Sequence, residues 1–322
     1  MQFQEMTRVV QDDLLALDTE IQHQLASDVP LVHFIGEHII QSGGKRLRPL
    51  ITLLAGHCLG AQGAQLVRLA AVIEFLHTAT LLHDDVVDTS ELRRGQPTAN
   101  KQWGNAPSVL VGDFLYSRAF QMMVDIGSLP VMAVLANATN VIAEGEVLQL
   151  AHVGDPELTR EAYYRVIRGK TAMLFAAAAQ SAATLASANP TINAAMSQYG
   201  LELGMAFQIQ DDVLDYQGDT DVLGKTAGDD LAEGKVTLPL IYTLEHCSAD
   251  AQSKLHQMIR AGGSHDLPFV LEIMARCGAL EWCRQQALAH SKAAQQHALS
   301  LPEHPSREVL LKLAEQAVAR VA

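Results

Sequence analysis

The sequence predicts an all-α fold, formed by one large helical domain over residues 1–322. Apolar residues recur with helical spacing from one end of the chain to the other. Aromatic residues make up only 5% of the chain, and the alternating pattern of half-buried strands is absent. A hydrophobic content of 48% suffices for a large core and excludes a disordered chain. Because no linker, tandem repeat or break in composition divides the sequence, we expect a single domain.

Glycine and proline mark where the predicted helices begin and end. Residues 42–45 (SGGK) end one helix, and Pro49 fits the first turn of the next. The expected long helices cover residues 5–26, 29–42, 48–60, 63–90, 107–126, 128–152, 159–187 and 191–216. Shorter helices cover residues 236–246, 249–261, 265–276, 278–299 and 303–320, in a more polar C-terminal third that we interpret as a subordinate lobe.

Charge and cysteine content exclude several classes of protein. The net charge of −13 argues against nucleic-acid binding, which requires a basic surface. The four cysteines show no CxxC spacing and are too few for a disulfide scaffold, which favours the reducing cytoplasm. The alanine-rich run at residues 171–188 is interrupted by polar side chains, so we interpret it as a buried helix. We therefore expect a cytoplasmic protein that is not integral to a membrane.

One acidic pattern occurs twice, as DDVVD at Asp84–Asp88 and as DDVLD at Asp211–Asp215. The first and fifth residues of each pattern share a face of a helix that turns ~100° per residue. Carboxylates held that close repel each other and favour a bound cation. Mg²⁺ suits such a site because it takes a few carboxylates and completes its shell with water and phosphate oxygens.

A pair of solvated, acidic helix ends is the alternative interpretation. One occurrence of the pattern would favour it, but both copies follow apolar helical runs and both precede glycine-bearing basic loops (ELRRGQ and LGKTAGDDLAEGK). The copies begin 127 residues apart (211 − 84), so they lie on separate helices that we expect to face each other. Acidic metal ligands beside basic residues predict a diphosphate site.

Further basic and polar residues accompany the acidic patterns. Residues 43–49 (GGKRLRP) place Lys45 and Arg48 in a glycine-bearing turn before a helix, where backbone N–H groups also favour anions. A basic loop of this kind is more often simply solvated. His77 lies two turns before Asp84 on the same stripe, although a lone histidine on an apolar helix is more often a core residue.

The order of these motifs resembles that of the trans-isoprenyl diphosphate synthases. GGKRLRP, HTATLLHDDVVDTSELRRG, GKT, FQIQDDVLD and GKTAGDDLAEGKVTLP carry the resemblance, which extends from about Val32 to the end and is closest to the octaprenyl branch. The resemblance implies a helical bundle with the active site in a central cavity, a Mg²⁺ cofactor with Mn²⁺ as an alternative, and a homodimer. It also implies that the product supplies quinone side chains.

The resemblance further implies roles for individual residues. An allylic diphosphate would bind through metal ions held by the motif aspartates, namely Asp84, Asp88, Asp211, Asp212 and Asp215, with Asp85 supporting. The same diphosphate would contact Arg93, Lys170, Thr171, Gln208, Lys225 and Lys235. Isopentenyl diphosphate would bind without metal at Lys45, Arg48, His77 and Arg94. No protein nucleophile is required.

Product length should depend on the residues that line the path of the growing tail. Ala79 and Thr80 stand five and four residues before Asp84, and both are small. In short-chain members of the family a bulky aromatic residue stops growth here, so its absence implies a longer product. Candidates for the floor are Phe120, Met122 and Met123. We expect seven to nine isoprene units, with eight preferred.

Three alternatives remain at this stage. A geranylgeranyl, heptaprenyl or solanesyl synthase would differ only in product length. A terpene cyclase shares the fold and one aspartate motif but binds no second diphosphate, whereas this chain has both motifs and the GGKRLRP loop. An inactive partner subunit commonly loses aspartates or the basic loop, and none is lost here.

Overall fold

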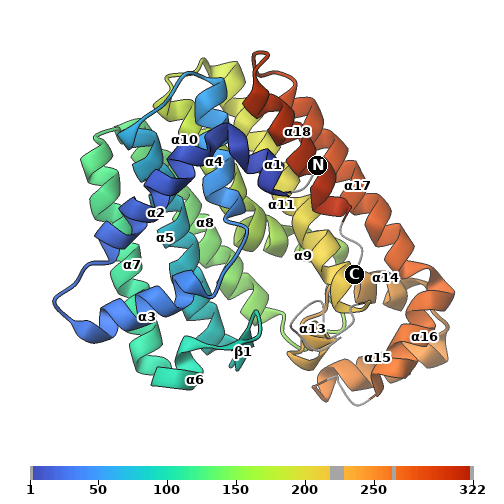
Figure 1. Cartoon of the computed structure of the whole chain (residues 1–322). Coiled ribbons are helices and arrows are strands. Elements are labelled where there is room, and N and C mark those ends of the chain that lie inside the picture. Colours follow the sequence, from blue (N-terminus) through green and yellow to red (C-terminus); the bar gives the residue numbers. More distant parts are fainter. Residues whose placement is uncertain (1–2, 218–227, 263–265, 320–322) are drawn as a thin grey trace. The chain divides into compact units, whose positions relative to one another are not determined.

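A computed structural model describes residues 3–217, 228–262 and 266–319, and it is built almost entirely of helices (Figure 1). The chain divides into two compact units. Unit 1 comprises Met1–Thr139, Leu174–Gly200 and Gln296–Lys312. Unit 2 comprises Asn140–Met173, Leu201–Gln295 and Leu313–Ala322. The all-α prediction is confirmed.

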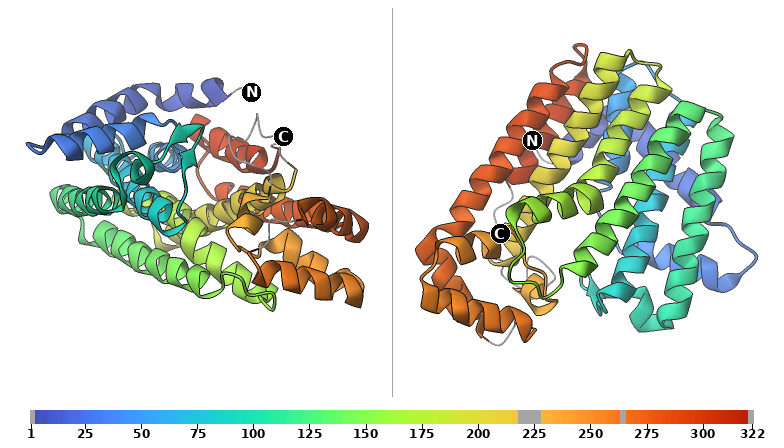
Figure 2. Two further views of the ribbon diagram at one scale, coloured as in Figure 1. Left: turned by 90° about the horizontal axis from the view of Figure 1, so that it is seen from below. Right: turned by 180° about the vertical axis from the view of Figure 1, so that it is seen from behind.

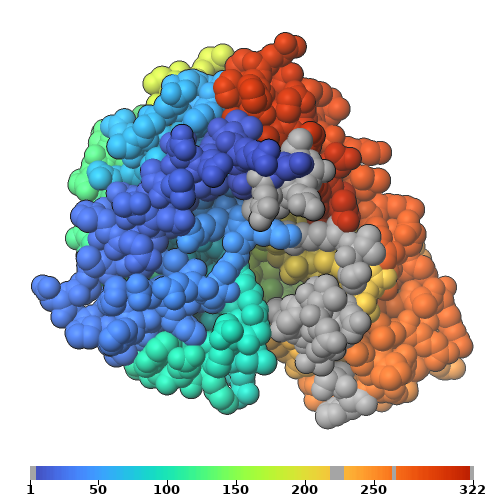
Figure 3. Space-filling view, in the orientation of Figure 1, coloured from blue at the N-terminus to red at the C-terminus, as the bar shows by residue number. Residues whose placement is uncertain are grey.

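Unit 1 contains the first helices of the chain, and α2 and α3 form part of the surface visible in Figure 3. Its elements are α1 (Phe3–Thr7), a 3₁₀ turn η1 (Arg8–Val10), α2 (Gln11–Leu25), α3 (Pro30–Gln41), α4 (Leu47–Cys58), α5 (Ala64–Val87), α6 (Ala99–Trp103) and α7 (Asn105–Ile126). The first half of α8 (Leu129–Ala151), most of α10 (Met173–Leu185) and the first part of α11 (Pro190–Asp215) also belong to it.

Helix α5 is the core of unit 1 and carries the first aspartate motif at its C-terminal end. It packs against α2, α4 and α7, and buried residues occur on all of its sides. A helix that is apolar all round is stable in water only when neighbours cover it. The Ser108 hydroxyl of α7 donates to the Leu82 carbonyl at 3.1 Å, which fixes α7 beside the motif.

A short hairpin was absent from the sequence prediction. Strands β1 (Leu92–Arg93) and β2 (Gln96–Pro97) pair antiparallel, with Arg93 opposite Gln96. The two turn residues, Arg94 and Gly95, both have positive φ, at 52° and 76°. This is the conformation of a type I′ turn, which suits the twist of a two-stranded hairpin. Strands of two residues are too short to show an alternating pattern, and the prediction missed them for that reason.

Unit 2 carries the second aspartate motif at the end of α11. Its other elements are α9 (Arg160–Ile167), the π-helical segment η2 (Arg168–Ala172), α13 (Asp229–Ala232), α14 (Leu238–His246), α15 (Ala249–Arg260), α16 (Leu267–Cys277), most of α17 (Ala279–Ala298) and the end of α18 (Pro305–Val318). Proline in the first turn of α14 and α16 and the side-chain cap of Asp266 on the Phe269 N–H agree with the predicted boundaries.

Two glycines bring α8 and η2 into backbone contact within unit 2. A Cβ atom on Gly145 would lie 2.6 Å from the Lys170 nitrogen, and one on Gly169 would lie 3.2 Å from the Val141 carbonyl oxygen. A side chain at Gly145 would force the two backbones apart, and one at Gly169 would require a smaller shift. The prediction of one continuous helix over residues 159–187 missed the π-helical turn, a distortion that often marks functional sites.

Helix α10 is buried from Leu174 to Ala183 apart from Gln180, as expected for the alanine-rich run. Two described helices, α5 and α8, are long and apolar enough to span a membrane by length and composition alone. That finding is weak, because 67% of the relevant stretch of α5 is buried in the protein.

The single-domain prediction remains a prediction. The boundaries between the two units fall within α8, α10, α11, α17 and α18, not in linkers. The residue ranges of α8 and α11, both drawn as helices in Figure 2, include residues of both units.

Candidate active site

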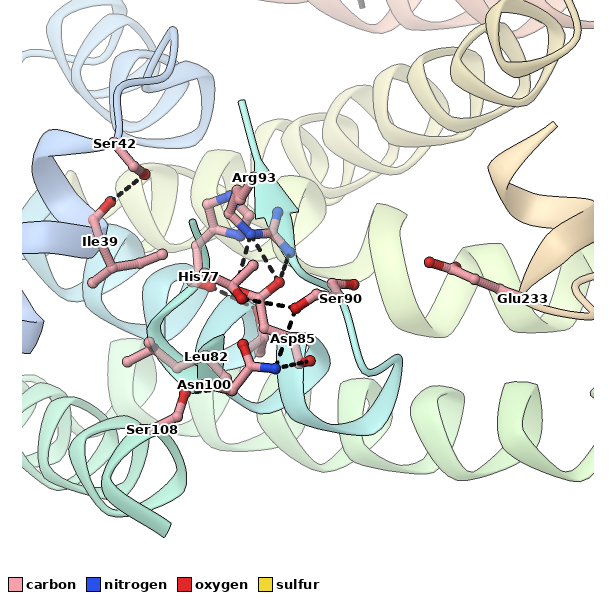
Figure 4. Close-up of polar contacts among 12 residues, drawn as sticks. Ile39, Ser42, His77, Leu82, Asp85, Ser90, Arg93, Asn100, Ser108 and Glu233 are labelled. Atoms are coloured by element: carbon pink, nitrogen blue, oxygen red, sulfur yellow. Dashed lines mark hydrogen bonds and ion pairs between the residues drawn. The ribbon is translucent and has the colours of Figure 1, made fainter. Parts of the chain in front are cut away.

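The first aspartate motif presents two accessible carboxylates and buries a third. Asp84 and Asp88 are partly exposed and lie one turn apart, with the Asp88 N–H bonded to the Asp84 carbonyl at 2.8 Å. Asp85 is fully buried and accepts from Arg93, whose Nε lies 3.1 Å from Oδ1 and whose Nη2 lies 2.7 Å from the same atom. Figure 4 shows the guanidinium of Arg93 directed at Asp85. The buried carboxylate therefore orients a residue predicted to contact the diphosphate.

Asn100 holds the loop that follows the first motif. Its Nδ2 donates to the carbonyl of Asp85 at 3.0 Å and to that of Ser90 at 3.2 Å (Figure 4). The Thr98 hydroxyl also donates to the Ser90 carbonyl, at 2.7 Å. These bonds fix the path from α5 into the hairpin, and so place Arg93 and Arg94.

The glycine-bearing loop and the hairpin turn lie together in unit 1. A Cβ atom on Gly44, whose φ is 152°, would come within 2.6 Å of the Arg94 guanidinium. Arg46 and Arg94 both adopt left-handed backbone conformations, Arg46 immediately before α4 and Arg94 in the hairpin turn. The loop that carries Lys45 therefore lies beside Arg94, as a shared anion site requires.

Arg48 and His77 form a hydrogen bond, with Arg48 Nη1 donating to His77 Nε2 at 3.1 Å. The guanidinium also stacks on the buried ring of Phe175, 4.2 Å from its centroid. Burial and the nearby arginines lower the pKa of His77 well below its usual value, so the ring is neutral and accepts. Burial also lowers the pKa of Arg48 to about 10. The structure thus joins these two predicted residues in one polar pair.

A carboxylate that the sequence analysis missed lies among these arginines. Glu74 is one turn before His77 on α5, and its Oε2 is buried with no hydrogen-bond partner among the described residues. Burial raises the pKa of Glu74, while the charges of Arg46, Arg48 and Arg94 lower it. Glu74 shares a face of α5 with His77, and this spacing is the feature of the sequence that could have identified it as a site residue.

The second motif shows the same division of exposed and buried aspartates. Asp211 is exposed and Asp215 is partly exposed, whereas only 2% of Asp212 is accessible. The Asp215 carbonyl accepts from the Gly228 N–H at 2.9 Å, which ties the beginning of α13 to the end of α11.

Three residues form a hydrogen-bonded chain with Asp212. Gln208 Nε2 donates to Asp212 Oδ1 at 2.7 Å, and the Thr171 hydroxyl donates to Gln208 Oε1 at 2.8 Å. The Tyr163 hydroxyl donates to Asp212 Oδ2. Burial and the charges of neighbouring acids raise the pKa of Asp212, and the hydrogen bonds from Tyr163 and Gln208 oppose that rise. The structure therefore connects Thr171, Gln208 and Asp212, which the sequence placed on two separate segments.

The predicted lysines of unit 2 are paired with acidic or amide side chains. Lys170 Nζ lies 2.6 Å from Glu146 Oε2 and 2.8 Å from Gln149 Oε1, both on α8. Lys235 Nζ lies 2.6 Å from Glu233 Oε2. Lys225 lies outside the described residues. Glu146, Gln149 and Tyr163 were not predicted, because helical residues outside a motif are recognisable as site residues only once the fold brings them to the site.

The accessible aspartates fit the chemistry of Mg²⁺. No group of three or more histidine, cysteine or carboxylate residues forms a metal site among the described residues. Mg²⁺ is usually bound by one or two carboxylates together with substrate phosphates. Asp84 with Asp88, and Asp211 with Asp215, each supply two accessible oxygen donors one turn apart, which matches that requirement.

The residues predicted to control product length lie on α5 and α7, which pack together. Ala79, Met122 and Met123 are almost fully buried, and Phe120 is partly buried. Thr80 is partly buried, and its hydroxyl donates to the His77 carbonyl at 2.7 Å. Their assignment to a tail path remains a prediction.

Comparisons with known proteins agree with this arrangement. Residues 29–274 match the polyprenyl synthetase family. The chain is 50% identical to the octaprenyl diphosphate synthase of Escherichia coli (strain K12), over 99% of both chains. It superimposes on a decaprenyl diphosphate synthase from Rhodobacter capsulatus with a TM-score of 0.95, at 42% identity and full coverage of both chains. A polyprenyl synthase from Caulobacter crescentus, complexed with calcium and isoprenyl diphosphate, gives 0.94 at 42% identity, over 100% of this chain and 98% of that one. The chain therefore belongs to the polyprenyl synthetase family of prenyltransferases.

Proposed function

We propose that this enzyme condenses an allylic diphosphate, such as farnesyl diphosphate, with successive molecules of isopentenyl diphosphate to make octaprenyl diphosphate for quinone side chains. The proposal rests on one observation. Each aspartate motif combines accessible carboxylates with a buried aspartate, and that buried aspartate is hydrogen-bonded to a residue predicted to contact the diphosphate, Arg93 in the first motif and Gln208 in the second. The 50% identity to an octaprenyl diphosphate synthase supports the product length.

The allylic diphosphate would be bound by both aspartate motifs. Asp84, Asp88, Asp211 and Asp215 would hold Mg²⁺, which neutralises the negative charge of the departing diphosphate when bound. Arg93, held by Asp85, would donate to the phosphate oxygens, as would Lys170 and Lys235. Lys170 would exchange its contact with Glu146 for the diphosphate.

Isopentenyl diphosphate would bind at the basic cluster of unit 1. Lys45, Arg48 and Arg94 supply the positive charge, and neutral His77 keeps the Arg48 guanidinium in place through the 3.1 Å bond. The close approach of the Gly44 backbone to the Arg94 guanidinium keeps this positive charge together.

The reaction needs no protein nucleophile. Cleavage of the allylic C–O bond leaves a delocalised carbocation and releases diphosphate. The π electrons of the isopentenyl double bond form the new C–C bond, and loss of a proton, taken up by the released diphosphate, restores a double bond. The protein's cations stabilise the developing charge on the leaving group.

Homodimer formation and a cytoplasmic location are further parts of the proposal. Exposed residues recur along α8 at alternating intervals of four and three positions, which is the spacing at which two helices pack side by side. The stripe comprises Leu129, Ala133, Ala136, Asn140, Ala143, Val147 and Leu150. Leu129 and Val147 are 78% and 68% exposed, so a second copy of the chain would bury apolar area here. The four free cysteines support a reducing compartment.

Product analysis tests the proposed function. The purified chain is incubated with farnesyl diphosphate, labelled isopentenyl diphosphate and Mg²⁺, and the products are separated by chain length. We expect an eight-unit product. A shorter or longer product would correct the chain length, a cyclic hydrocarbon would indicate a cyclase, and the absence of any product would indicate an inactive subunit.

A further inference from the structure

Tyr163 contacts the second aspartate motif and was not among the residues predicted to form the site. It lies in the first turn of α9, whose start is capped by the Thr159 hydroxyl accepting from the Ala162 N–H at 3.2 Å. Only 3% of Tyr163 is exposed. All of its contacts described below lie within unit 2.

The Tyr163 hydroxyl completes the hydrogen bonding of Asp212. It donates to Oδ2, while Gln208 Nε2 donates to Oδ1, so both oxygens of this buried carboxylate accept from protein donors. A buried aspartate in this position is poorly suited to bind a metal ion, unlike its exposed neighbour Asp211. This geometry differs from the predicted role of Asp212 as a metal ligand.

Asp212 in turn fixes the orientation of the Gln208 amide. The amide nitrogen faces Asp212 Oδ1, to which it donates, and the amide oxygen faces Thr171, whose hydroxyl donates to it at 2.8 Å. The bond to Asp212 uses one of the two amide hydrogens, which leaves the second to donate to a phosphate oxygen. A flipped amide would present an oxygen to the phosphate instead.

The first motif supplies an independent parallel. Its second aspartate, Asp85, is also fully buried and also holds a predicted diphosphate contact, Arg93. In both motifs the aspartates at the first and fifth positions are the accessible ones. The same position therefore orients a donor in each half of the chain.

We propose that Tyr163 is a positioning residue for the allylic diphosphate: its hydroxyl holds Asp212, and Asp212 orients Gln208 and Thr171. This role rests on the proposed function. Removal of the hydroxyl leaves Asp212 with one partner fewer, which frees the carboxylate to rotate and the Gln208 amide to flip. Metal binding at Asp211 and the isopentenyl site in unit 1 remain intact.

The test is Tyr163→Phe, which removes only the hydroxyl, with Tyr164→Phe as the matched control. We expect Tyr163→Phe to raise KM for farnesyl diphosphate about tenfold, the size of one lost hydrogen bond to a charged group, and to leave KM for isopentenyl diphosphate within about twofold. Melting temperature and helical circular dichroism identify a variant that fails to fold. Equal effects on both substrates, or on both tyrosine variants, would overturn the positioning role.

A second variant keeps the inference testable if Tyr163→Phe is unstable. Asp212→Asn should raise KM for farnesyl diphosphate without changing the Mg²⁺ concentration needed for half-maximal activity, whereas Asp211→Asn should raise that concentration. A higher Mg²⁺ requirement in Asp212→Asn would make Asp212 a metal ligand and overturn the inference. A wild-type enzyme that elongates no substrate would overturn the proposed function, whereas an active wild type with an unchanged Tyr163→Phe variant would overturn only the role of Tyr163.

Discussion

Individual residues of the site divide into those that a motif reveals and those that only the fold reveals. The sequence identified Asp84, Asp88 and Asp211 by a repeated pattern, and their accessibility in the structure agrees with the proposed role. It could not predict that Asp85 and Asp212 are buried, because burial depends on what packs against the helix. Contacts such as Glu146 with Lys170 join residues 24 positions apart, and no local pattern encodes them.

The two proposed diphosphate sites predict different kinetic effects for their cations. Arg94→Ala should raise KM chiefly for isopentenyl diphosphate, because Arg94 lies with the Gly44 loop. Lys170→Ala should raise KM chiefly for the allylic substrate. Each loss of a charged contact costs ~1.5–3 kcal/mol, about one to two decades in affinity. Steady-state kinetics with each substrate varied in turn provide the measurement, and each variant is the control for the other. Unchanged isopentenyl kinetics in Arg94→Ala would show that the two sites are assigned wrongly.

The lowered pKa of His77 predicts a pH dependence of stability. Below its ordinary pKa of 6.5 the unfolded chain takes up a proton that the folded, buried ring resists. Folding stability is therefore lost as the pH falls below about 6.5. Glu74, whose pKa is raised, contributes the opposite slope above its ordinary pKa of 4.5, where the folded protein retains a proton that the unfolded chain releases.

Comparison with His77→Gln isolates this contribution. Melting temperatures measured from pH 7.5 to pH 5.5 should fall more steeply for the wild type than for the variant, because only the wild type carries the titrating ring. Parallel curves for the two proteins would mean that His77 takes up a proton in the folded state as readily as in the unfolded chain.

At the scale of elements, the sequence predicted the ends of helices more accurately than it predicted local distortions of the backbone. Helices α3, α8 and α14 begin and end within two residues of their predicted limits, because proline and glycine punctuate the chain there. The hairpin at β1 and β2 and the π-helical turn of η2 were missed. Both depend on a few residues held by tertiary contacts, such as Asn100 to Ser90 and Gly145 to Gly169.

The contact between α8 and η2 predicts that Gly145→Ala impairs the allylic site. The added Cβ would lie 2.6 Å from the Lys170 nitrogen, and such overpacking costs ~1–3 kcal/mol. The variant should melt at a lower temperature and show a raised KM for farnesyl diphosphate, because Lys170 and Thr171 are displaced. Ala151→Ser, at the exposed C-terminal end of the same helix and outside the stripe, is the control. A variant with wild-type stability and kinetics would show that α8 can move away from η2 without consequence.

The packing of α5 against α7 predicts an effect on product length. Thr80→Phe places a ring one turn before Asp84, where it should stop elongation early while leaving the aspartates in place. Radiolabelled products of wild type and variant are compared by chain length, with Thr184→Phe, distant from the motif in sequence, as the control. An active variant that still makes the wild-type product would show that the tail does not pass Thr80.

At the scale of the whole molecule, composition and periodicity were sufficient for the fold class. The absence of strand patterns and the continuous helical spacing predicted the all-α architecture that the structure and its relatives share. The motifs then predicted a diphosphate enzyme, because two acidic pairs with adjacent cations suit metal-assisted ionisation. The division into two compact units was not predicted, since the boundaries lie inside helices and leave no mark in the sequence.

The central claim is that both aspartate motifs serve one metal-assisted reaction. Asp84→Ala and, separately, Asp211→Ala should each lower kcat by roughly 10²–10⁴, which corresponds to ~3–5 kcal/mol of lost stabilisation of the leaving group. Asp125→Ala, an exposed aspartate on α7, should retain wild-type activity. The measurement is single-turnover condensation of farnesyl diphosphate with labelled isopentenyl diphosphate at saturating Mg²⁺. The account predicts near-complete loss in both motif variants with helical content intact, and near-normal turnover in either one would contradict it.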